Sequence, residues 1–208
     1  MITTSFILFS YLAGSIPFGV LVARAKGIDI RQVGSGNIGA TNVGRILGRG
    51  YGLLVFALDF LKGFGPVLAT RLLGPRLDSG PFASFDLPVL CAAAAVLGHV
   101  SSIWLRFRGG KGGATGLGVG AVLVWPAMLA AGAIWLAVVA ITRYVSLGTI
   151  LGSIAYVAAF LVMAFLEGDP FDREHRALTI FCTAVTALVV YRHKDNIRRL
   201  INGTENKV

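Results

Sequence analysis

Long apolar runs constrain this chain more than any other feature. Four of them, at residues 2–23, 51–73, 87–105 and 147–166, are predominantly hydrophobic. A helix needs about 20 such residues to cross a hydrocarbon core of about 30 Å. Over the whole chain 55% of the residues are hydrophobic, 14% are charged and the mean hydropathy is +0.76. A soluble helical core would need more polar surface, so we predict an all-α polytopic membrane protein.

Two further apolar stretches have unusual lengths. The stretch 114–141 is too long for one ordinary span and too short for two full ones, and Pro126 lies near its centre. Proline breaks a helix interior, so we predict two short helices that meet near Trp125 and Pro126. The stretch 177–191 is also short, but membranes accept short or tilted helices. The sequence therefore predicts seven spans.

The distribution of charge assigns an orientation to these seven spans. One set of connecting segments holds 14 of the 19 Lys and Arg residues and only three acids. These segments are 24–50, 104–113, 142–146 and 191–208. The opposite loops, 74–86 and 167–176, hold three basic and six acidic residues. Because cytoplasmic loops carry the excess of Lys and Arg, we predict that the N-terminus lies outside and the C-terminus in the cytoplasm.

Composition also argues against several classes of site and partner. Cys91 and Cys182 lie inside apolar runs, which gives neither a disulfide framework nor a metal cluster. Carboxylates are scarce in the predicted cytoplasmic segments, so we expect no metal and no other cofactor. The net charge of +9 lies mainly in those segments, where anionic lipid head groups are suitable partners. No soluble domain remains to read a nucleic acid.

The first basic segment contains a glycine-rich stretch at 34–45. Its glycine spacing matches a dinucleotide-binding fingerprint, but that motif requires a βαβ unit, which is not expected here. Glycines free the backbone to turn N–H groups toward an anion. Ser35, Asn37 and Asn42 add donors, and Arg45 offers a fork that suits phosphate. The stretch is either an anion site or a flexible turn between helices.

The second basic segment reads GHVSSIWLRFRGGKGGAT at 98–115. It lacks the Walker spacing of a nucleotide-binding loop. Its glycines nevertheless permit close backbone approach to a phosphate, and Lys111 supplies a positive charge. Thr115 starts a helix whose N-terminus attracts anions. His99 is either a packing residue or a catalyst, and Ser101 follows it two residues later.

The chain's basic tail reads RHKDNIRRL at 192–200 and is amphipathic. Taken alone, it is typical of a helix at a membrane surface. Because it follows a span directly, His193 and Asn196 can turn inward at helical spacing. Arg143 and Ser146 lie at another predicted cytoplasmic turn.

Two charged residues, Asp59 and Lys62, lie inside an apolar run. They are three residues apart and can therefore pair on one helix. A charge within the bilayer is costly and is usually paired or functional. We predict a structural ion pair that holds the site together.

Three stretches, GSGNIGATNVGR at 34–45, GHVSSIWLRFRGGKGGAT at 98–115 and RHKDNIRRL at 192–200, occur in this order between apolar runs. Together they resemble the bacterial acyl-phosphate:glycerol-3-phosphate acyltransferase family, over nearly the whole chain. The resemblance implies that the primary hydroxyl of glycerol 3-phosphate attacks the carbonyl of a fatty acyl phosphate. The products are lysophosphatidic acid and phosphate, and neither acyl-CoA nor acyl carrier protein is required. It also implies one catalytic domain, 1–208, in the bacterial plasma (inner) membrane with its active site facing the cytoplasm.

This reaction assigns roles to the polar residues named above. The candidate catalytic residues are Lys111, His99, His193 and Ser146. The candidate substrate-binding residues are Ser35, Gly36, Asn37, Asn42, Arg45, Ser101, Gly109, Gly110, Gly112, Thr115 and Asn196. We expect the first stretch to bind glycerol 3-phosphate and the second to bind the acyl phosphate.

The sequence leaves two mechanisms and a second functional class open. In one mechanism His99 or His193 is the general base. In the other, a phosphate oxygen of the substrate takes the proton while the protein positions the reactants. The cationic loops favour the second, because positive charge nearby makes a histidine a weaker base. A transporter of organophosphate anions is the other class, but no outer gate or inverted halves are evident.

Overall fold

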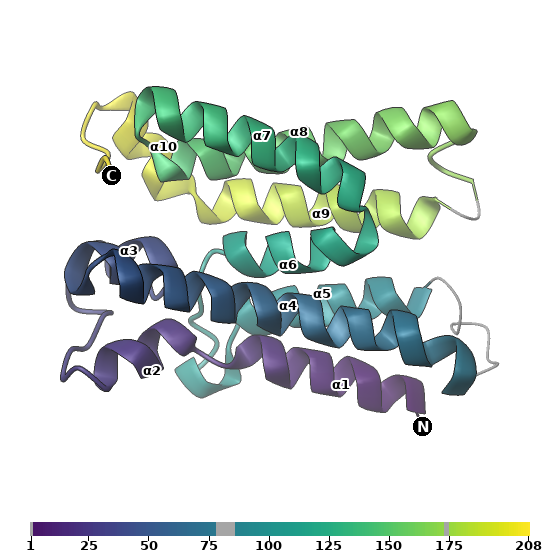
Figure 1. Cartoon of the computed structure of the whole chain (residues 1–208), viewed down its shortest axis with the longest axis horizontal. Helices are drawn as coiled ribbons and strands as arrows, with labels where there is room; N and C mark the ends of the chain where they lie inside the picture. Colours follow the sequence, from purple (N-terminus) through teal and green to yellow (C-terminus); the bar gives the residue numbers. More distant parts are fainter. Residues whose placement is uncertain (1, 78–85, 173–174) are drawn as a thin grey trace. The chain divides into compact units, whose positions relative to one another are not determined.

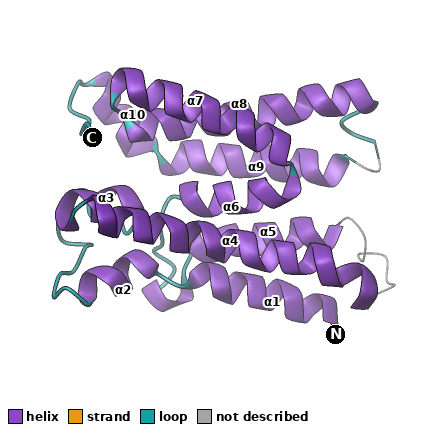
Figure 2. Ribbon diagram, in the orientation of Figure 1, coloured by secondary structure: helices purple, strands orange, loops and turns teal. Residues whose placement is uncertain are grey.

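The chain folds as helices joined by loops (Figures 1 and 2). The computed structural model describes residues 2–77, 86–172 and 175–208. Within these ranges every regular element is a helix. The helices group into two compact units, Met1–Leu123 and Val124–Val208. The predicted all-α fold class is confirmed.

The first unit begins with a helix that is interrupted by a proline. α1 (Ile2–Ser15) and α2 (Phe18–Arg24) are separated by Ile16 and Pro17. Proline has no N–H to continue the helical ladder, so the chain breaks here and leaves backbone groups to be satisfied by other residues. The unit continues with α3 (Ala40–Leu47), α4 (Arg49–Leu77), α5 (Asp86–Val100), the 3-10 helix η1 (Ile103–Leu105) and α6 (Gly113–Leu123).

Glycines bring the long helices of the first unit into close contact. α1 packs against α5, and α4 packs against α6. At Gly14 a Cβ atom would overlap the backbone of Ala95 on α5, and at Gly118 it would overlap the backbone of Phe60 on α4. In lipid, where apolar side chains gain little by meeting one another, such close backbone packing holds helices together.

The second unit is built on a helical hairpin. Its elements are α7 (Trp125–Thr142), α8 (Val145–Glu167), α9 (Arg176–Arg192) and α10 (Lys194–Ile201). α8 packs against both α7 and α9. At Gly148 of α8 a Cβ atom would overlap the side chain of Val139 on α7, and at Gly152 it would come close to the backbone of Ala131. α10 is a short helix that follows α9 after His193.

The helix break predicted near Trp125 and Pro126 is confirmed. α6 ends at Leu123, and α7 begins at Trp125 with Pro126 in its first turn. Proline is tolerated there because the first N–H groups of a helix have no intrahelical partner. The break therefore divides an apolar stretch that hydropathy alone reads as continuous.

Several helices are long and apolar enough to cross a membrane. Five candidate spans occur in the described residues: Thr3–Arg24, Arg49–Leu73, Leu87–Leu105, Trp125–Thr142 and Val145–Glu167. Gly113–Leu123 is a shorter apolar helix. Large apolar side chains such as Leu53, Leu129 and Leu166 are exposed, as contact with lipid requires. A total of seven spans, which would include α6 and the 17-residue α9, stays a prediction.

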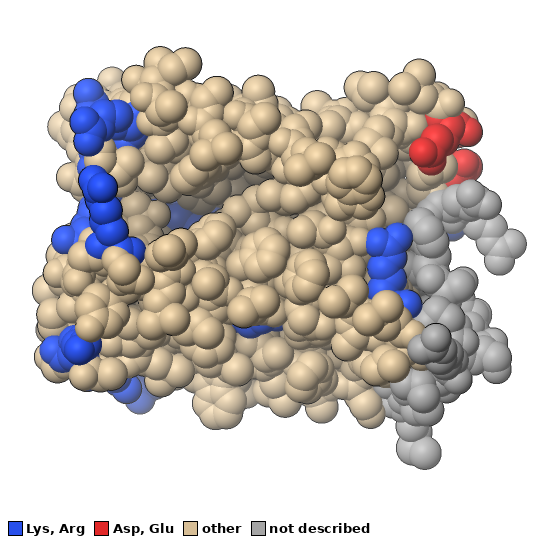
Figure 3. Space-filling model, in the orientation of Figure 1, with Lys and Arg blue, Asp and Glu red and all other residues tan. Residues whose placement is uncertain are grey.

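Charged side chains gather toward helix ends in each unit (Figure 3). In the second unit, acidic residues lie where α8 joins α9, and Lys and Arg lie at the end that carries α10. In the first unit, α2 ends and α4 begins at the same end, and the α5–α6 segment leads back from it (Figure 1). The two glycine-rich basic stretches therefore share one end of the first unit.

Candidate functional site

Asn42 of α3 organises the first glycine-rich loop. Its side chain is 2% exposed. Its Oδ1 accepts a hydrogen bond from the backbone N–H of Ser35 (2.9 Å), and its Nδ2 donates to the carbonyl oxygens of Asn37 (2.9 Å) and Val33 (3.1 Å). The carboxamide is thus used within the protein. Its contacts give Asn42 a structural role, and direct contact with substrate stays a prediction.

The loop around Asn42 leaves other donors at the surface. Gly34 and Gly36 adopt positive φ angles of 60° and 67°, which favour glycine. A side chain at Gly34 would also overlap Oδ1 of Asn42. Ser35 and Arg45 are exposed, while Asn37 is half-buried and its Oδ1 accepts the N–H of Gly39 at 3.0 Å. The loop therefore exposes the residue Ser35, and the helix that follows it exposes the residue Arg45.

The second glycine-rich stretch folds back onto the end of α5. The N–H groups of Gly109 and Gly110 donate to the carbonyl oxygens of Val100 and His99, each at 3.0 Å. These two N–H groups are engaged within the protein, which does not support the phosphate-binding role predicted for them. Gly112 has a φ of 88°, and α6 begins directly after it. The first-turn N–H groups of α6, which lack intrahelical partners, therefore follow Lys111 in the chain.

The other residues predicted in this stretch have different environments. Lys111 is half-buried. Ser101 is half-buried, and its carbonyl accepts a hydrogen bond from the hydroxyl of Tyr11 at 2.9 Å. Thr115 is completely buried, and its hydroxyl donates to the backbone carbonyl of Asp59 at 3.0 Å. Thr115 thus ties α6 to α4 through its side chain, and Lys111 is a cation shortly before the start of α6.

The predicted ion pair is present in α4. Nζ of Lys62 lies 2.7 Å from Oδ1 of Asp59, and both side chains are buried. Lys62 also donates to the carbonyl of Ile16 at 2.7 Å, in the break between α1 and α2. On the other side, Nδ1 of His99 lies 3.9 Å from the same carboxylate oxygen. The pair therefore connects three segments of the first unit.

In the second unit, the predicted residues Ser146 and Asn196 meet at a carboxylate that the sequence did not single out. Oε1 of Glu205 accepts hydrogen bonds from Oγ of Ser146 (2.9 Å) and Nδ2 of Asn196 (2.7 Å). Its Oε2 accepts one from Nε of Arg199 at 2.7 Å. Burial raises the pKa of Glu205, but the bonds from Asn196, Arg199 and Ser146 outweigh it and hold the pKa below its usual value. Glu205 thereby joins α8 to α10.

His193 is buried at the junction of α9 and α10. Its Nδ1 lies 2.7 Å from the carbonyl oxygen of Val189. A carbonyl only accepts, so this contact places the proton on Nδ1 and makes Nε2 the basic nitrogen of the neutral ring. The geometry is therefore compatible with a base or an acceptor at Nε2.

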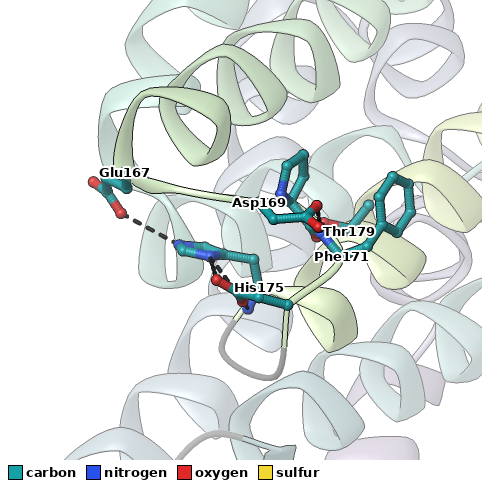
Figure 4. Close-up of polar contacts among 7 residues, drawn as sticks. Glu167, Asp169, Phe171, His175 and Thr179 are labelled. Carbon is teal, nitrogen blue, oxygen red and sulfur yellow. Dashed lines mark hydrogen bonds and ion pairs between the residues drawn. The ribbon is translucent and has the colours of Figure 1, made fainter.

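The remaining histidine, His175, lies at the other end of the second unit, in the turn between α8 and α9 (Figure 4). Its Nδ1 lies 3.1 Å from Oδ1 of Asp172, and its Nε2 lies 3.3 Å from Oε2 of Glu167. Burial lowers the pKa of His175, but the contacts with Asp172 and Glu167 outweigh this and raise it overall. Oδ1 of Asp169 accepts the N–H of Phe171 nearby. This group orders the turn and is separate from the predicted site residues.

Comparison with known proteins identifies the family. Residues 4–203 match the family model described as glycerol-3-phosphate acyltransferase. The chain belongs to this family. A glycerol-3-phosphate acyltransferase of Aquifex aeolicus is 44% identical over 97% of this chain and 96% of its own length. The glycerol-3-phosphate acyltransferase of Geobacter sulfurreducens is 47% identical over 95% of this chain and 93% of its own length.

Two solved structures of a family member resemble the present fold. The crystal structure of PlsY, an integral membrane glycerol 3-phosphate acyltransferase, in its glycerol 3-phosphate form has a TM-score of 0.85 and 38% sequence identity. That match covers 100% of this chain and 96% of the other. The lysophosphatidic acid form has a TM-score of 0.81 and 37% identity, over 100% and 95% of the two chains. The predicted family, membrane fold and enzyme class are thus confirmed, and the transporter alternative is not favoured.

Proposed function

We propose that this glycerol-3-phosphate acyltransferase uses a fatty acyl phosphate as its donor. The primary hydroxyl oxygen of glycerol 3-phosphate attacks the acyl carbonyl carbon. The bond between that carbon and the phosphate oxygen breaks, and phosphate leaves with the electron pair. The single observation that carries the proposal is that two basic glycine-rich stretches, 34–45 and 98–115, lie at the same end of the first unit. Both substrates carry a phosphate that such stretches suit.

In this proposal the first stretch binds glycerol 3-phosphate. Ser35 is exposed in the turn that Asn42 holds in shape, and Arg45 is exposed on α3, the helix that carries Asn42. A guanidinium can bind phosphate through two parallel hydrogen bonds. These bonds fix the orientation of the phosphate, and the positive charge of the guanidinium attracts it. Gly36 and Asn37 complete the turn. Asn42 serves indirectly, by keeping the backbone of Ser35 in place.

The acyl phosphate binds at the second stretch. Lys111 immediately precedes the glycines that start α6. The helix dipole and the first-turn N–H groups favour negative charge there. As the hydroxyl attacks, charge develops on the carbonyl oxygen, and donors fixed in advance stabilise it without reorganising. Lys111 is accordingly the residue for which we expect the largest loss of turnover.

A phosphate oxygen of the substrate accepts the proton of the attacking hydroxyl. His99 is ill suited to this task because its ring is buried between Asp59 and Gly110. His193 is the alternative base, through Nε2. Substituting His193 by Gln removes that basic nitrogen but keeps a hydrogen-bonding group. Turnover of His193→Gln within about tenfold of wild type supports the substrate phosphate, because losing a general base costs about 10²–10⁴-fold.

We further propose that both units serve one reaction, as a single catalytic domain of residues 1–208. Ser146, His193 and Asn196 are the residues through which the second unit would contribute. The proposed site faces the cytoplasm of a bacterial inner membrane, because the basic stretches carry the excess of positive charge that marks this side.

The proposal is tested with detergent-solubilised protein, labelled glycerol 3-phosphate and a long-chain acyl phosphate. We expect labelled lysophosphatidic acid without any vesicle, which excludes transport as the sole activity. Parallel reactions contain acyl-CoA or acyl carrier protein loaded with the same chain. Product formed from either of these donors but not from acyl phosphate would overturn the donor assignment.

A further inference from the structure

We propose that Asp59, Lys62 and His99 form a buried positioning cluster that holds the glycine turn 109–112 in the shape that phosphate binding requires. The inference rests on the proposed function, in which Lys111 and the start of α6 bind the acyl phosphate. It goes beyond that function because none of these three residues is assigned to substrate binding. We infer instead that they fix the shape of the turn. The evidence is a set of contacts within the first unit.

The charges of the cluster are held where charge is costly. The side chains of Asp59 and Lys62 are 4% and 3% exposed, within the candidate span Arg49–Leu73. Buried ion pairs rarely stabilise a fold more than apolar residues of the same size would, so their presence calls for another reason. Lys62 also donates to the carbonyl of Ile16, which lies in the break between α1 and α2 and accepts the N–H of Phe18 as well. The cluster thus ties α4 to the break between α1 and α2.

His99 connects the cluster to the glycine turn. Its Nδ1 faces Oδ1 of Asp59 at 3.9 Å. The opposite edge of the ring faces Gly110, where a Cβ atom would overlap Nε2. The backbone carbonyl of His99 also accepts the N–H of Gly110 at 3.0 Å. His99 therefore lies against the residue that directly precedes Lys111 through both its ring and its backbone carbonyl.

Asp59 is linked to both sides of this turn through His99 and Thr115. Its carboxylate lies beside His99, which holds Gly110. Its backbone carbonyl accepts the hydroxyl of Thr115, in the first turns of α6, at 3.0 Å. The segment that contains Lys111 is thus held on either side by contacts that lead to one residue of α4. This geometry makes His99 a positioning residue instead of a general base.

The first test measures amide exchange in the turn. The variants are His99→Leu and the double variant Asp59→Leu with Lys62→Met, which removes both charges together and avoids leaving one buried without its partner. The N–H groups of Gly109 and Gly110 are hydrogen-bonded, so we expect about tenfold faster exchange in a peptide spanning 106–113 in both variants. Thr70→Val, which removes a buried hydroxyl from the same helix, serves as the control and should leave that peptide unchanged.

The second test separates positioning from general folding and from base catalysis. We expect the KM for acyl phosphate to rise about tenfold in both variants, with the KM for glycerol 3-phosphate changed by less than about twofold. His99→Asn keeps a donor at the place of Nδ1, so it should retain more activity than His99→Leu and keep the wild-type pH profile.

Unchanged exchange at 106–113 in both variants would overturn the inference, as would an equal rise in both KM values. Equal loss of turnover in His99→Asn and His99→Leu, with a lost limb of the pH profile, would instead make His99 the base. If wild-type protein does not use acyl phosphate, the proposed donor is wrong, and the exchange measurement still decides whether the cluster holds the turn.

Discussion

Asn42 and Glu205 act in similar ways at two places in the chain. Each is a buried polar side chain whose hydrogen bonds join a loop to a helix: Asn42 of α3 bonds to the loop before it, and Glu205, after α10, bonds to side chains of α10. Leaving such a partner unsatisfied costs about 1–3 kcal/mol, more when it is charged. At the residue scale, the shape of the polar stretches therefore depends on side chains that need not touch a substrate.

Arg45 gives the clearest prediction for substrate binding. Arg45→Ala should raise the KM for glycerol 3-phosphate about ten- to a hundredfold, the equivalent of one charge-assisted hydrogen bond of about 1.5–3 kcal/mol. Arg45→Lys should also raise it, because the paired geometry of the guanidinium is lost. The measurement is steady-state kinetics at saturating acyl phosphate. Arg49→Ala, which removes another exposed cation at the start of α4, is the matched control. Equal KM values in Arg45→Ala and Arg49→Ala would contradict the role of Arg45.

The lowered pKa of Glu205 predicts that the stability of the fold depends on pH. Its pKa in the folded protein lies below the usual value, so its contribution is fully present above that usual value and is lost as the pH falls through the folded pKa. Glu205→Gln should therefore lower the Tm at neutral pH and reduce the fall in Tm between about pH 5 and pH 3. Thermal unfolding in detergent measures both. If Tm falls as steeply at low pH in Glu205→Gln as in the wild type, groups other than Glu205 cause that fall.

At the scale of helices, close contact between backbones replaces the hydrophobic driving force that is weak in lipid. Glycine permits this contact at Gly14 against α5 and at Gly118 against α4. Two of the seven prolines act differently from each other: Pro17 follows the end of α1, and Pro126 lies in the first turn of α7, where it is tolerated.

Gly14→Val should destabilise the first unit, because the added side chain would overlap the backbone of Ala95. Overpacking typically costs about 1–3 kcal/mol, which should appear as a Tm several degrees lower. Gly65→Val is the control, since nothing lies within 4 Å of the corresponding Cβ position. If both variants melt at the same temperature, the close contact of α1 with α5 does not limit stability.

At the scale of the whole molecule, the alternation of basic and acidic connections implies one orientation in the membrane. Basic residues dominate the segments at 24–50 and 191–208, whereas the 167–176 connection is acidic. In the second unit these two kinds of charge lie at different ends (Figure 3). Positive charge is retained on the cytoplasmic side, so the acidic connection between α8 and α9 should face outward.

The orientation can be measured with single cysteines and a maleimide that does not cross membranes. Phe171→Cys places a thiol in the α8–α9 turn, and Thr204→Cys places one after α10; both native side chains are exposed. We expect Phe171→Cys to react in intact spheroplasts and Thr204→Cys only after permeabilisation. The wild-type protein, whose Cys91 and Cys182 are buried, is the control. Reaction of Thr204→Cys in intact spheroplasts would reverse the orientation.

Much of the fold follows from local sequence properties. The lengths and hydropathy of the apolar runs predict the long helices. Pro126 predicts the break before α7, because proline has no N–H to donate within a helix. Both properties belong to neighbouring residues in the sequence and need no distant contact. Asp59 and Lys62 were predicted to pair because three residues along a helix bring side chains together. The glycine-rich basic stretches indicate the polar end of the first unit, because their composition can be read directly from the sequence.

Only the tertiary structure decided what individual polar residues do. Thr115 and Asn42 look like ligands in sequence, yet their side chains bond to α4 and to the loop preceding α3. Glu205 gave no signal beyond being an acid in a basic tail. A hydrogen bond depends on which distant segments come within about 3 Å, and that distance is set by the packing of whole helices. The spacing of residues along the sequence does not give that distance.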